Sequence, residues 1–470
     1  MKLLFDRGTV VISRPPQLLD VQSLPGVLWD PRTEQYRAPA WLLEDIERAL
    51  AGRGVEVIRT AACQIRLARP WQRVQLREYQ SAALLAWQAT GRRGIVALPT
   101  GSGKTRVGMA AAAAASKSAL FLVPTRVLLH QWVKEIGALY EGPVGCLGDG
   151  QSQIEAVTVA TFESAYRWMP RIGDRFVLLV VDEAHHFGLG SRVETLEMST
   201  APWRLGLTAT PNRELEGAAL LGRLLGPVVF RLSVDDLAGR FLADYEIVTL
   251  ELDLTPDERE RYQEQIEIFR AVHRTFRRLN PEADWAAFVR AASRSEQGRR
   301  ALGAWRRARD LLGFTEAKAD LLGRLLERHC QTRVLIFTPD NQTAYAVARR
   351  HLVMPITCDI KHTERERVLG WFEQGKIRAL VSARVLNEGL DVPDADVAVI
   401  VGGLLGPREH VQRIGRLLRP RDGKRALVYE LVCRNTGEVF QAQRRRRGFA
   451  AQQSVTGSAA RRPDGAALLE

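Results

Sequence analysis

The feature that most constrains the fold of this 470-residue chain is a series of short, predominantly apolar stretches separated by helical segments. Five such stretches occur between residues 74 and 229, and four more occur between 333 and 433. A strand that is apolar on both faces belongs in a parallel sheet covered by helices on each side. The two series therefore predict two α/β lobes. Their expected strands are 94–98, 119–123, 157–160, 176–181 and 204–208 in the first lobe, and 334–337, 379–381, 397–401 and 426–431 in the second.

The segments outside these two series have different patterns. Residues 1–70 combine β-rich runs at 8–12 and 55–58 with an amphipathic helix at 41–51 and many Pro and Gly residues, which predicts a small α/β domain. Residues 254–312 are typical of charged helices. We therefore expect an N-terminal domain (1–70), a first lobe (71–240), a helical insertion (241–312), a second lobe (313–440) and a disordered basic tail (441–470).

The positive charge of the chain is concentrated in two segments. The net charge is +13, of which residues 269–309 supply +8 through eleven arginines against three acidic residues, and residues 441–470 supply +4. Such an excess favours a polyanionic partner, although a solvated surface would have the same composition. We favour the solvated surface for the tail and phosphate binding for the middle segment, with Arg274, Arg277 and Arg278 as expected contacts.

Residues 98–105, Leu-Pro-Thr-Gly-Ser-Gly-Lys-Thr, stand between an apolar strand and a helix, as a phosphate-binding loop does. The glycines allow backbone N–H groups to point at phosphate oxygens at the positive end of the helix dipole. The lysine would neutralise the β and γ phosphates, and the threonine after it would bind magnesium. Leu98 replaces the first glycine of the strict pattern, so this is a variant loop, and a simple helix cap is the alternative. The expected nucleotide contacts are Thr100, Gly101, Ser102, Gly103, Lys104 and Thr105.

Two adjacent carboxylates follow the apolar run 176–181, in the sequence Asp182-Glu183-Ala184-His185. Asp182 would hold magnesium, and Glu183 would polarise the attacking water as a general base. The neighbouring histidines 185 and 186 also suggest a metal site, but no further ligands are spaced nearby. We therefore expect His185 to couple the two lobes and His186 to be structural.

A helix predicted at 410–419 carries a second set of polar residues. Gln412, Arg416 and Arg419 recur at spacings of three and four, which places them on one helix face. The planar guanidinium pairs bidentately with phosphate oxygens. We expect Arg416 and Arg419 to complete the nucleotide site from the second lobe, beside Gly389 and Asp391. The alternative is a solvated basic face.

The order of these motifs resembles that of the superfamily 2 helicases, which implies two RecA-like lobes with ATP and Mg²⁺ between them. The resemblance assigns further roles by position. Arg77 and Gln80, in Leu76-Arg-Glu-Tyr-Gln80, match the adenine-reading element. The residues that match the grip on a nucleic-acid backbone are Thr125, Arg126 and Thr161. The residues that match the element coupling hydrolysis to lobe movement are Thr208 and Thr210.

Within the superfamily, the chain is similar to the XPB-type DNA repair helicases, especially the compact archaeal and bacterial forms, up to about residue 439. Residues 5–12, with Trp29-Asp-Pro-Arg and Tyr36-Arg-Ala, resemble their N-terminal damage-recognition domain. Residues 255–312 correspond to their thumb, which implies DNA binding. Arg213 and Glu214 match the start of an Arg-Glu-Asp signature expected to contact DNA, but leucine replaces the aspartate.

Four aromatic residues of the thumb-like segment have two interpretations. Phe276, Trp285, Phe288 and Trp305 could stack on bases. The helical spacing of Trp285, Phe288 and Val289 instead favours a core position for most of them.

The resemblance implies an ATP-dependent 3′–5′ DNA helicase or translocase that opens DNA for repair. One alternative is a double-strand translocase or remodelling motor without processive unwinding, and another is a DNA-binding scaffold with weak ATPase activity. The complete set Lys104, Asp182, Glu183 and Arg419 argues against the scaffold. We expect single-stranded, forked or bubble DNA as the substrate of a monomer, with a structure-specific nuclease as a partner. The apolar runs are too short to span a membrane and the five cysteines show no paired spacing, so we expect a cytoplasmic protein.

Overall fold

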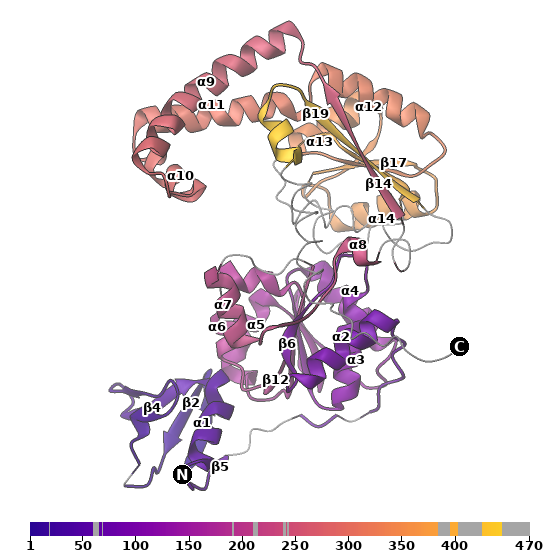
Figure 1. Cartoon of the computed structure of the whole chain (residues 1–470). Helices are drawn as coiled ribbons and strands as arrows, with labels where there is room; N and C mark the ends of the chain where they lie inside the picture. The colour runs from indigo at the N-terminus through magenta and orange to yellow at the C-terminus, as the bar shows by residue number, and fades with distance from the viewer. Residues whose placement is uncertain are drawn as a thin grey trace, which may run out of the picture. The chain divides into compact units, whose positions relative to one another are not determined.

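The computed structural model describes residues 1–17, 19–59, 65–67, 69–189, 192–209, 215–237, 241, 244–383, 395–402 and 425–443. The chain forms two compact units, Met1–Ser233 and Val234–Glu470 (Figure 1). No helix in the described ranges is both long and apolar enough to cross a membrane.

The first unit begins with a five-stranded sheet in the order β3-β4-β2-β1-β5. Its strands are β1 (Lys2–Asp6), β2 (Thr9–Ser13), β3 (Leu28–Asp30), β4 (Gln35–Pro39) and β5 (Ile58–Arg59). The helix α1 (Leu43–Ala51) buries Ile46 and Leu50 against this sheet. It begins two residues later than expected because Ala40–Leu42 form a 3₁₀ turn.

The larger sheet of the first unit has the order β13-β6-β12-β11-β7-β10-β8-β9, and its neighbouring strands are parallel except β8 and β9. The five expected strands are all present, as β6 (Arg93–Ala97), β7 (Ala119–Val123), β10 (Val157–Thr161), β11 (Leu178–Val181) and β12 (Trp203–Thr208). The strands β8 (Val144–Gly148), β9 (Gln151–Gln153) and β13 (Val228–Arg231) extend its edges.

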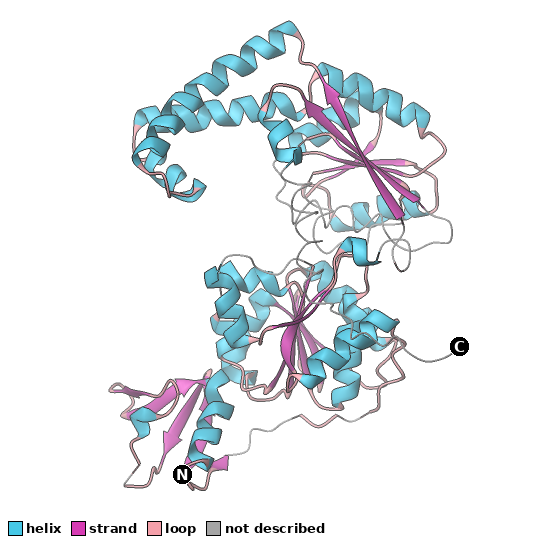
Figure 2. Cartoon of the chain, viewed as in Figure 1, coloured by secondary structure: helices cyan, strands magenta, loops and turns pink. Residues whose placement is uncertain are grey.

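Helices cover both faces of this sheet (Figure 2), as central strands with buried residues on both faces require. They are α2 (Glu78–Ala89), α3 (Lys104–Ala115), α4 (Arg126–Gly137), α5 (Phe162–Ile172), α6 (Glu194–Glu197) and α7 (Leu215–Leu224), with a 3₁₀ helix η3 (Ala184–Leu189). The residues of β7, β10 and β11 are all buried.

The second unit contains a parallel sheet in the order β14-β19-β18-β15-β17-β16. Its strands are β14 (Asp244–Leu252), β15 (Val334–Phe337), β16 (Met354–Ile356), β17 (Ala379–Ser382), β18 (Val397–Ile400) and β19 (Arg425–Cys433). The helices of this unit outside the insertion are α8 (Val234–Leu237), α12 (Glu316–Arg328), α13 (Asn341–His351) and α14 (His362–Glu373). The predicted architecture of two parallel-sheet lobes is thus confirmed.

The helical insertion consists of α9 (Pro256–Leu279), α10 (Trp285–Ser293) and α11 (Glu296–Gly313). Thr255 and Glu258 form a capping box at the start of α9, with Pro256 in the first turn. The helices α9 and α11 run side by side, and α10 lies at the end distant from the second sheet (Figure 1). The strand β14 falls within the range 241–312 expected for the insertion, but it is hydrogen-bonded to β19 in the sheet.

Candidate nucleotide site

Three neighbouring strands of the first sheet bring the predicted catalytic residues to one edge. The strands β6, β12 and β11 are adjacent and parallel, so their carboxyl ends lie at the same edge. The loop 98–105 follows β6, Thr208 ends β12 and Asp182 follows β11. This edge is where ligands bind in open parallel sheets.

The loop after β6 has the backbone shape that a phosphate cradle needs. Gly101 and Gly103 have φ angles of +83° and +76°, in the left-handed region that favours glycine. A Cβ atom on Gly103 would lie 2.6 Å from Nε2 of Gln80. Gly103 is also the N-cap of α3, so the loop leads directly into the positive end of a twelve-residue helix.

Lys104 is buried at the start of α3 and faces the loop. Its Nζ lies 3.3 Å from the carbonyl oxygen of Leu98 and 3.4 Å from that of Pro99. These distances are long for hydrogen bonds, so the ammonium group can exchange both contacts for phosphate oxygens at little cost.

The two carboxylates after β11 lie in different electrostatic environments. Burial and the neighbouring Glu183 raise the pKa of Asp182 to about 6. Burial also opposes ionisation of Glu183, but the charges of Lys104 and the contact with His185 outweigh it and lower the pKa of Glu183 to about 2. Glu183 has a φ angle of +48°, in the left-handed region that non-glycine residues rarely adopt, at the point where the chain passes from β11 to η3.

Trp132 on α4 holds Asp182 in place, a contact that the sequence analysis did not predict. Its indole Nε1 donates a 2.9 Å hydrogen bond to Oδ2 of Asp182, and the backbone N–H of Glu183 donates a 2.9 Å bond to Oδ1. Trp132 is 1% exposed and packs on Phe121 of β7. The carboxylate orientation is therefore fixed before any ligand binds.

The two described residues expected to couple hydrolysis to movement are in contact. Nδ1 of His185 lies 3.1 Å from Oγ1 of Thr208, and 3.4 Å from Oε2 of Glu183. His186 stacks on His185 with ring centroids 4.4 Å apart. No group of three His, Cys, Asp or Glu side chains in the described ranges is arranged to hold a metal ion. His185 therefore links the carboxylate beside the loop to the end of the next strand.

Gln80 and Tyr79 of α2 connect this helix to the phosphate loop. The Gln80 amide donates a 2.8 Å bond to the carbonyl oxygen of Ser102 and accepts a 2.9 Å bond from the backbone N–H of Arg77. The Tyr79 hydroxyl donates a 2.6 Å bond to the same Ser102 oxygen. Gln80 thus supports the loop in this structure, and the roles of Gln80 and Arg77 toward adenine stay predictions.

The donor atoms at this edge fit a magnesium-bound nucleotide. The hydroxyl oxygen of Thr100 is buried and has no hydrogen-bond partner among the described residues. A hydroxyl and a carboxylate, from Thr105 and Asp182, are hard oxygen ligands of the kind that Mg²⁺ prefers. The glycine-shaped loop, a buried ammonium group and these oxygens together fit the requirements of a phosphorylated ligand and its cation.

The residues expected to grip a nucleic-acid backbone lie at the next strand ends of the same edge. Thr125 lies just after β7 and caps α4, where its hydroxyl accepts a 3.3 Å bond from the N–H of Leu128. Thr161 ends β10 and caps α5, where its hydroxyl accepts a 3.2 Å bond from the N–H of Ser164. Arg126 is exposed and pairs with Asp149 at 3.3 Å. Two helix N-termini beside an exposed arginine form a surface suited to phosphates.

Some predicted site residues do not lie among the described residues at this edge of the first sheet. Arg274, Arg277 and Arg278 are exposed on α9 in the second unit. The others lie outside the described residues, and their roles stay predictions: Thr210, Arg213, Glu214, Gly389, Asp391, Gln412, Arg416 and Arg419.

Three protein families match the sequence. Residues 3–61 match the Xeroderma pigmentosum group B helicase damage recognition domain, residues 73–213 match the type III restriction enzyme res subunit, and residues 317–421 match the helicase conserved C-terminal domain.

The solved structures that match show the same fold at low sequence identity. The Hef helicase domain of Pyrococcus furiosus has a TM-score of 0.54 at 19% identity and covers 79% of this chain and 98% of that one. Dbp5 of S. cerevisiae, bound to RNA and ADP BeF3, has a TM-score of 0.55 at 16% identity, with 81% and 93% coverage.

Curated relatives are more similar in sequence. The DNA 3′-5′ translocase XPB2 of Sulfurisphaera tokodaii is 33% identical over 90% of this chain and 96% of its own length. The DNA 3′-5′ helicase XPB of Mycobacterium tuberculosis is 30% identical over 80% of this chain, which spans 64% of that relative. Since the first match covers nearly all of both proteins and the three families follow each other in the same chain, this protein belongs to the XPB family of DNA helicases and translocases.

Proposed function

We propose that this chain is an ATP-dependent 3′–5′ DNA translocase that opens DNA for repair. The observation that carries the proposal is the meeting of Lys104, Asp182 and Glu183 behind a glycine-shaped loop, with the His185–Thr208 contact beside them. The polarity and the DNA substrate come from the names of the relatives XPB2 and XPB.

The residues at the loop have separable roles in this proposal. Bound ATP with Mg²⁺ supplies the phosphoanhydride whose hydrolysis drives movement. The backbone N–H groups of 101–105 and the Lys104 ammonium bind phosphate oxygens, while Thr105 and Asp182 hold the cation. Glu183 is ionised, because the charges around it lower its pKa, and accepts a proton from the attacking water.

The His185–Thr208 contact supports a route from the nucleotide to the DNA grip. His185 contacts both Glu183 and Thr208, so a change in charge at the carboxylate alters the hydrogen bonding of the β12 end. The strand end of β12 leads toward Thr210, Arg213 and Glu214, which we propose as further coupling and DNA-contacting residues.

DNA would be held at two surfaces, one in each unit. In the first, the N-termini of α4 and α5 with Arg126 would bind backbone phosphates. In the second, the exposed arginines of α9 would do so. We also propose that Arg416 and Arg419 act on the nucleotide, that the protein works as a monomer, and that a structure-specific nuclease cuts the DNA that it opens.

The proposal is tested by measuring ATP hydrolysis without DNA and with single-stranded, duplex, forked and bubble DNA, while strand separation is followed on the same substrates. We expect DNA to stimulate hydrolysis and forked or bubble DNA to separate only when ATP is hydrolysed. Stimulation by duplex DNA without separation would favour a double-strand translocase. Hydrolysis that no DNA stimulates would contradict the proposal and support the scaffold.

A further inference from the structure

The aromatic residues of the helical insertion divide into a buried group and an accessible pair. Phe288 is 1% exposed and forms a small core with Ala292 and Leu302, against which Phe269 and Phe276 pack. Trp285 on α10 is 44% exposed, and Trp305 on α11 is half-buried. The core interpretation therefore accounts for the phenylalanines but leaves indole surface facing solvent.

The two tryptophans form a continuous strip with Arg309. The ring centroids of Trp285 and Trp305 are 4.9 Å apart, and the guanidinium carbon of Arg309 lies 4.6 Å from the centroid of Trp305. Phe288 packs against Trp285 at 5.4 Å and holds the exposed ring in place. We call Trp285, Trp305 and Arg309 the aromatic strip. Indole and guanidinium planes are both surfaces on which nucleobases stack.

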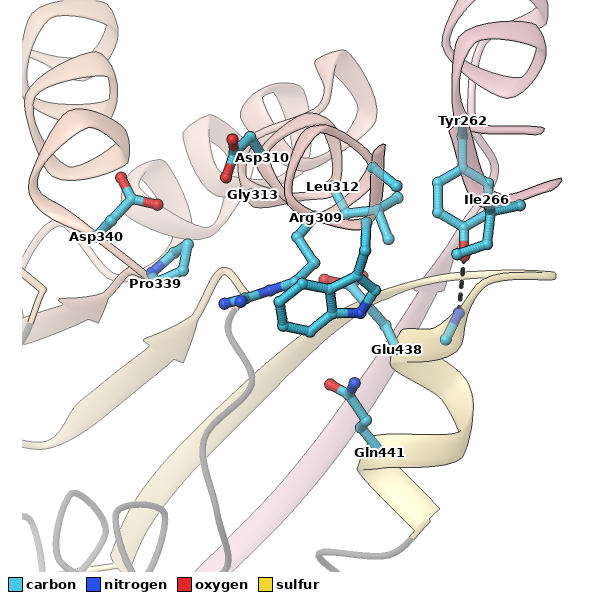
Figure 3. Close-up of a pocket in the computed structure, with 13 residues that line it drawn as sticks. Tyr262, Ile266, Arg309, Asp310, Leu312, Gly313, Pro339, Asp340, Glu438 and Gln441 are labelled. Atoms are coloured by element: carbon cyan, nitrogen blue, oxygen red, sulfur yellow. Dashed lines mark hydrogen bonds between the residues drawn. The ribbon is translucent and has the colours of Figure 1, made fainter. Parts of the chain in front are cut away.

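A pocket lies at the inner end of the aromatic strip, between the insertion and the second sheet (Figure 3). Trp305, Tyr262, Ile266 and Leu312 supply its apolar wall, and the Tyr262 hydroxyl accepts a 3.2 Å bond from the N–H of Gly437. The charged and amide side chains that line the pocket are those of Arg309, Asp310, Asp340, Glu438 and Gln441. An apolar wall with a few polar groups suits a planar ring with a hydrogen-bonding edge.

The size and position of the pocket indicate how such a ring would enter. With a volume of about 90 Å³, the pocket has room for part of a planar ring. Pro339 and Asp340 of its rim follow β15, which places the pocket at the carboxyl edge of the second parallel sheet. Exposed arginines on the same helices, among them Arg274 and Arg278, provide the charge that attracts a polyanion.

We propose that the aromatic strip and this pocket bind unpaired bases of single-stranded DNA, so that one face of the insertion follows the bases while its arginines follow the phosphates. The proposal rests on DNA being the substrate, as proposed above. It adds a specific claim, because phosphate binding alone does not distinguish a strand with bases from a strand without them. The strip accounts for exposed indole surface that a purely structural cluster would bury.

The test compares a single-stranded oligonucleotide with an abasic oligonucleotide of the same length and charge, at one salt concentration. The wild-type protein should bind the strand with bases more tightly. Trp285→Ala should weaken that binding by about fivefold or more, since one base–aromatic stack is lost, and should leave binding of the abasic strand unchanged. Trp285→Phe should retain the preference because a ring remains.

Control variants separate stacking from folding and from phosphate binding. Phe288→Leu alters the buried core, so it should lower the melting temperature yet keep the preference for bases. Arg274→Ala with Arg278→Ala should weaken binding of both strands alike. Equal affinity of the wild type for the two strands, or an unchanged preference in Trp285→Ala, would overturn the proposal. Neither result would affect the proposed translocase function, which fails instead if DNA does not stimulate ATP hydrolysis.

Discussion

Cationic groups have contrasting settings in two regions of the molecule. One region is the carboxyl edge of the larger sheet in the first unit, which carries the candidate nucleotide site and which we call the nucleotide edge, and the other is the helical insertion of the second unit. Lys104 is buried beside two carboxylates, and each of those carboxylates has a fixed hydrogen-bond or charge partner. The arginines of α9 are exposed to solvent along a helix with few buried residues. Charges interact strongly at a buried site, whereas salt screens those at an exposed one. We therefore expect single substitutions to be decisive at the nucleotide edge and small, additive effects on the insertion.

The contrast between the two regions would be broken most clearly by one arginine of the second unit whose loss alone stops catalysis. An arginine finger is worth roughly 10³ to 10⁵ in rate, so Arg419→Ala should slow ATP turnover by that factor with little change in ATP affinity. Single-turnover hydrolysis and nucleotide binding measured on the same variant provide the test. A loss below about tenfold would assign the finger to Arg416 or to another residue.

The next effect in size concerns the general base at the nucleotide edge. Glu183→Gln removes the proton acceptor but keeps the shape of the side chain, so turnover should fall by roughly 10² to 10⁴ while ATP stays bound. Glu251→Gln makes the same chemical change at an exposed ion pair with Arg434 in the second unit and should leave turnover unchanged. If the Glu183 variant neither binds nor retains ATP, the residue has a structural role.

A third prediction tests whether the fixed geometry of the nucleotide edge matters beyond the ligating atoms. Trp132→Phe keeps an aromatic ring against Phe121 but loses the hydrogen bond to Asp182. Outer partners of metal ligands are typically worth about 10- to 100-fold in metal affinity or activity, so half-maximal hydrolysis should need correspondingly more Mg²⁺.

The matched control for this prediction is Trp87→Phe. Trp87 is also buried in the first unit, but its indole donates to the carbonyl oxygen of Arg204 and not to a site residue. This variant should lower the melting temperature and leave the Mg²⁺ requirement unchanged. An equal shift in both variants would show that Trp132 acts only through stability.

The strands at the sheet centres could be predicted because they are short, predominantly apolar runs, as in Leu178–Val181 of β11 and Val334–Phe337 of β15. The edge strands could not be predicted in that way. Gln151–Gln153 of β9 is wholly polar, and β14 was included in the insertion although Val248, Leu250 and Leu252 alternate toward the core of the second sheet. That period-2 alternation is the signal that would have identified β14 as a half-buried strand.

The residues of the candidate site also divide into those that the sequence indicates and those that only the structure shows. Lys104, Asp182 and His185 are contiguous with motifs, so their meeting at one edge follows from parallel strand order. The support of Asp182 by Trp132 joins residues fifty positions apart, and the use of Gln80 by the loop depends on how α2 packs. Such contacts depend on tertiary packing and leave no local spacing pattern in the sequence.

The smallest expected effect belongs to the insertion and tests whether its arginines act additively. Each phosphate contact to single-stranded DNA contributes a slope of about −0.7 in log affinity against log salt. Arg277 donates a 2.8 Å bond to the carbonyl oxygen of Ala283 and so also closes the turn after α9. Arg274→Ala with Arg278→Ala should therefore flatten the slope by about 1.4 without a loss of stability, and adding Arg277→Ala should bring the change to about two while lowering the melting temperature.

The control removes the same number of charges elsewhere in the second unit. Arg324→Ala with Arg328→Ala changes two exposed arginines of α12, outside the insertion, and should leave the salt slope as it is. Basal ATP turnover should stay constant in these variants of α9 and α12, because neither helix carries a residue assigned to the nucleotide site, while DNA-stimulated turnover of the α9 variants should fall with affinity. An unchanged slope and unchanged stability in the α9 variants would show that these arginines form a solvated helix face, and the insertion would then contact DNA through its aromatic strip or not at all.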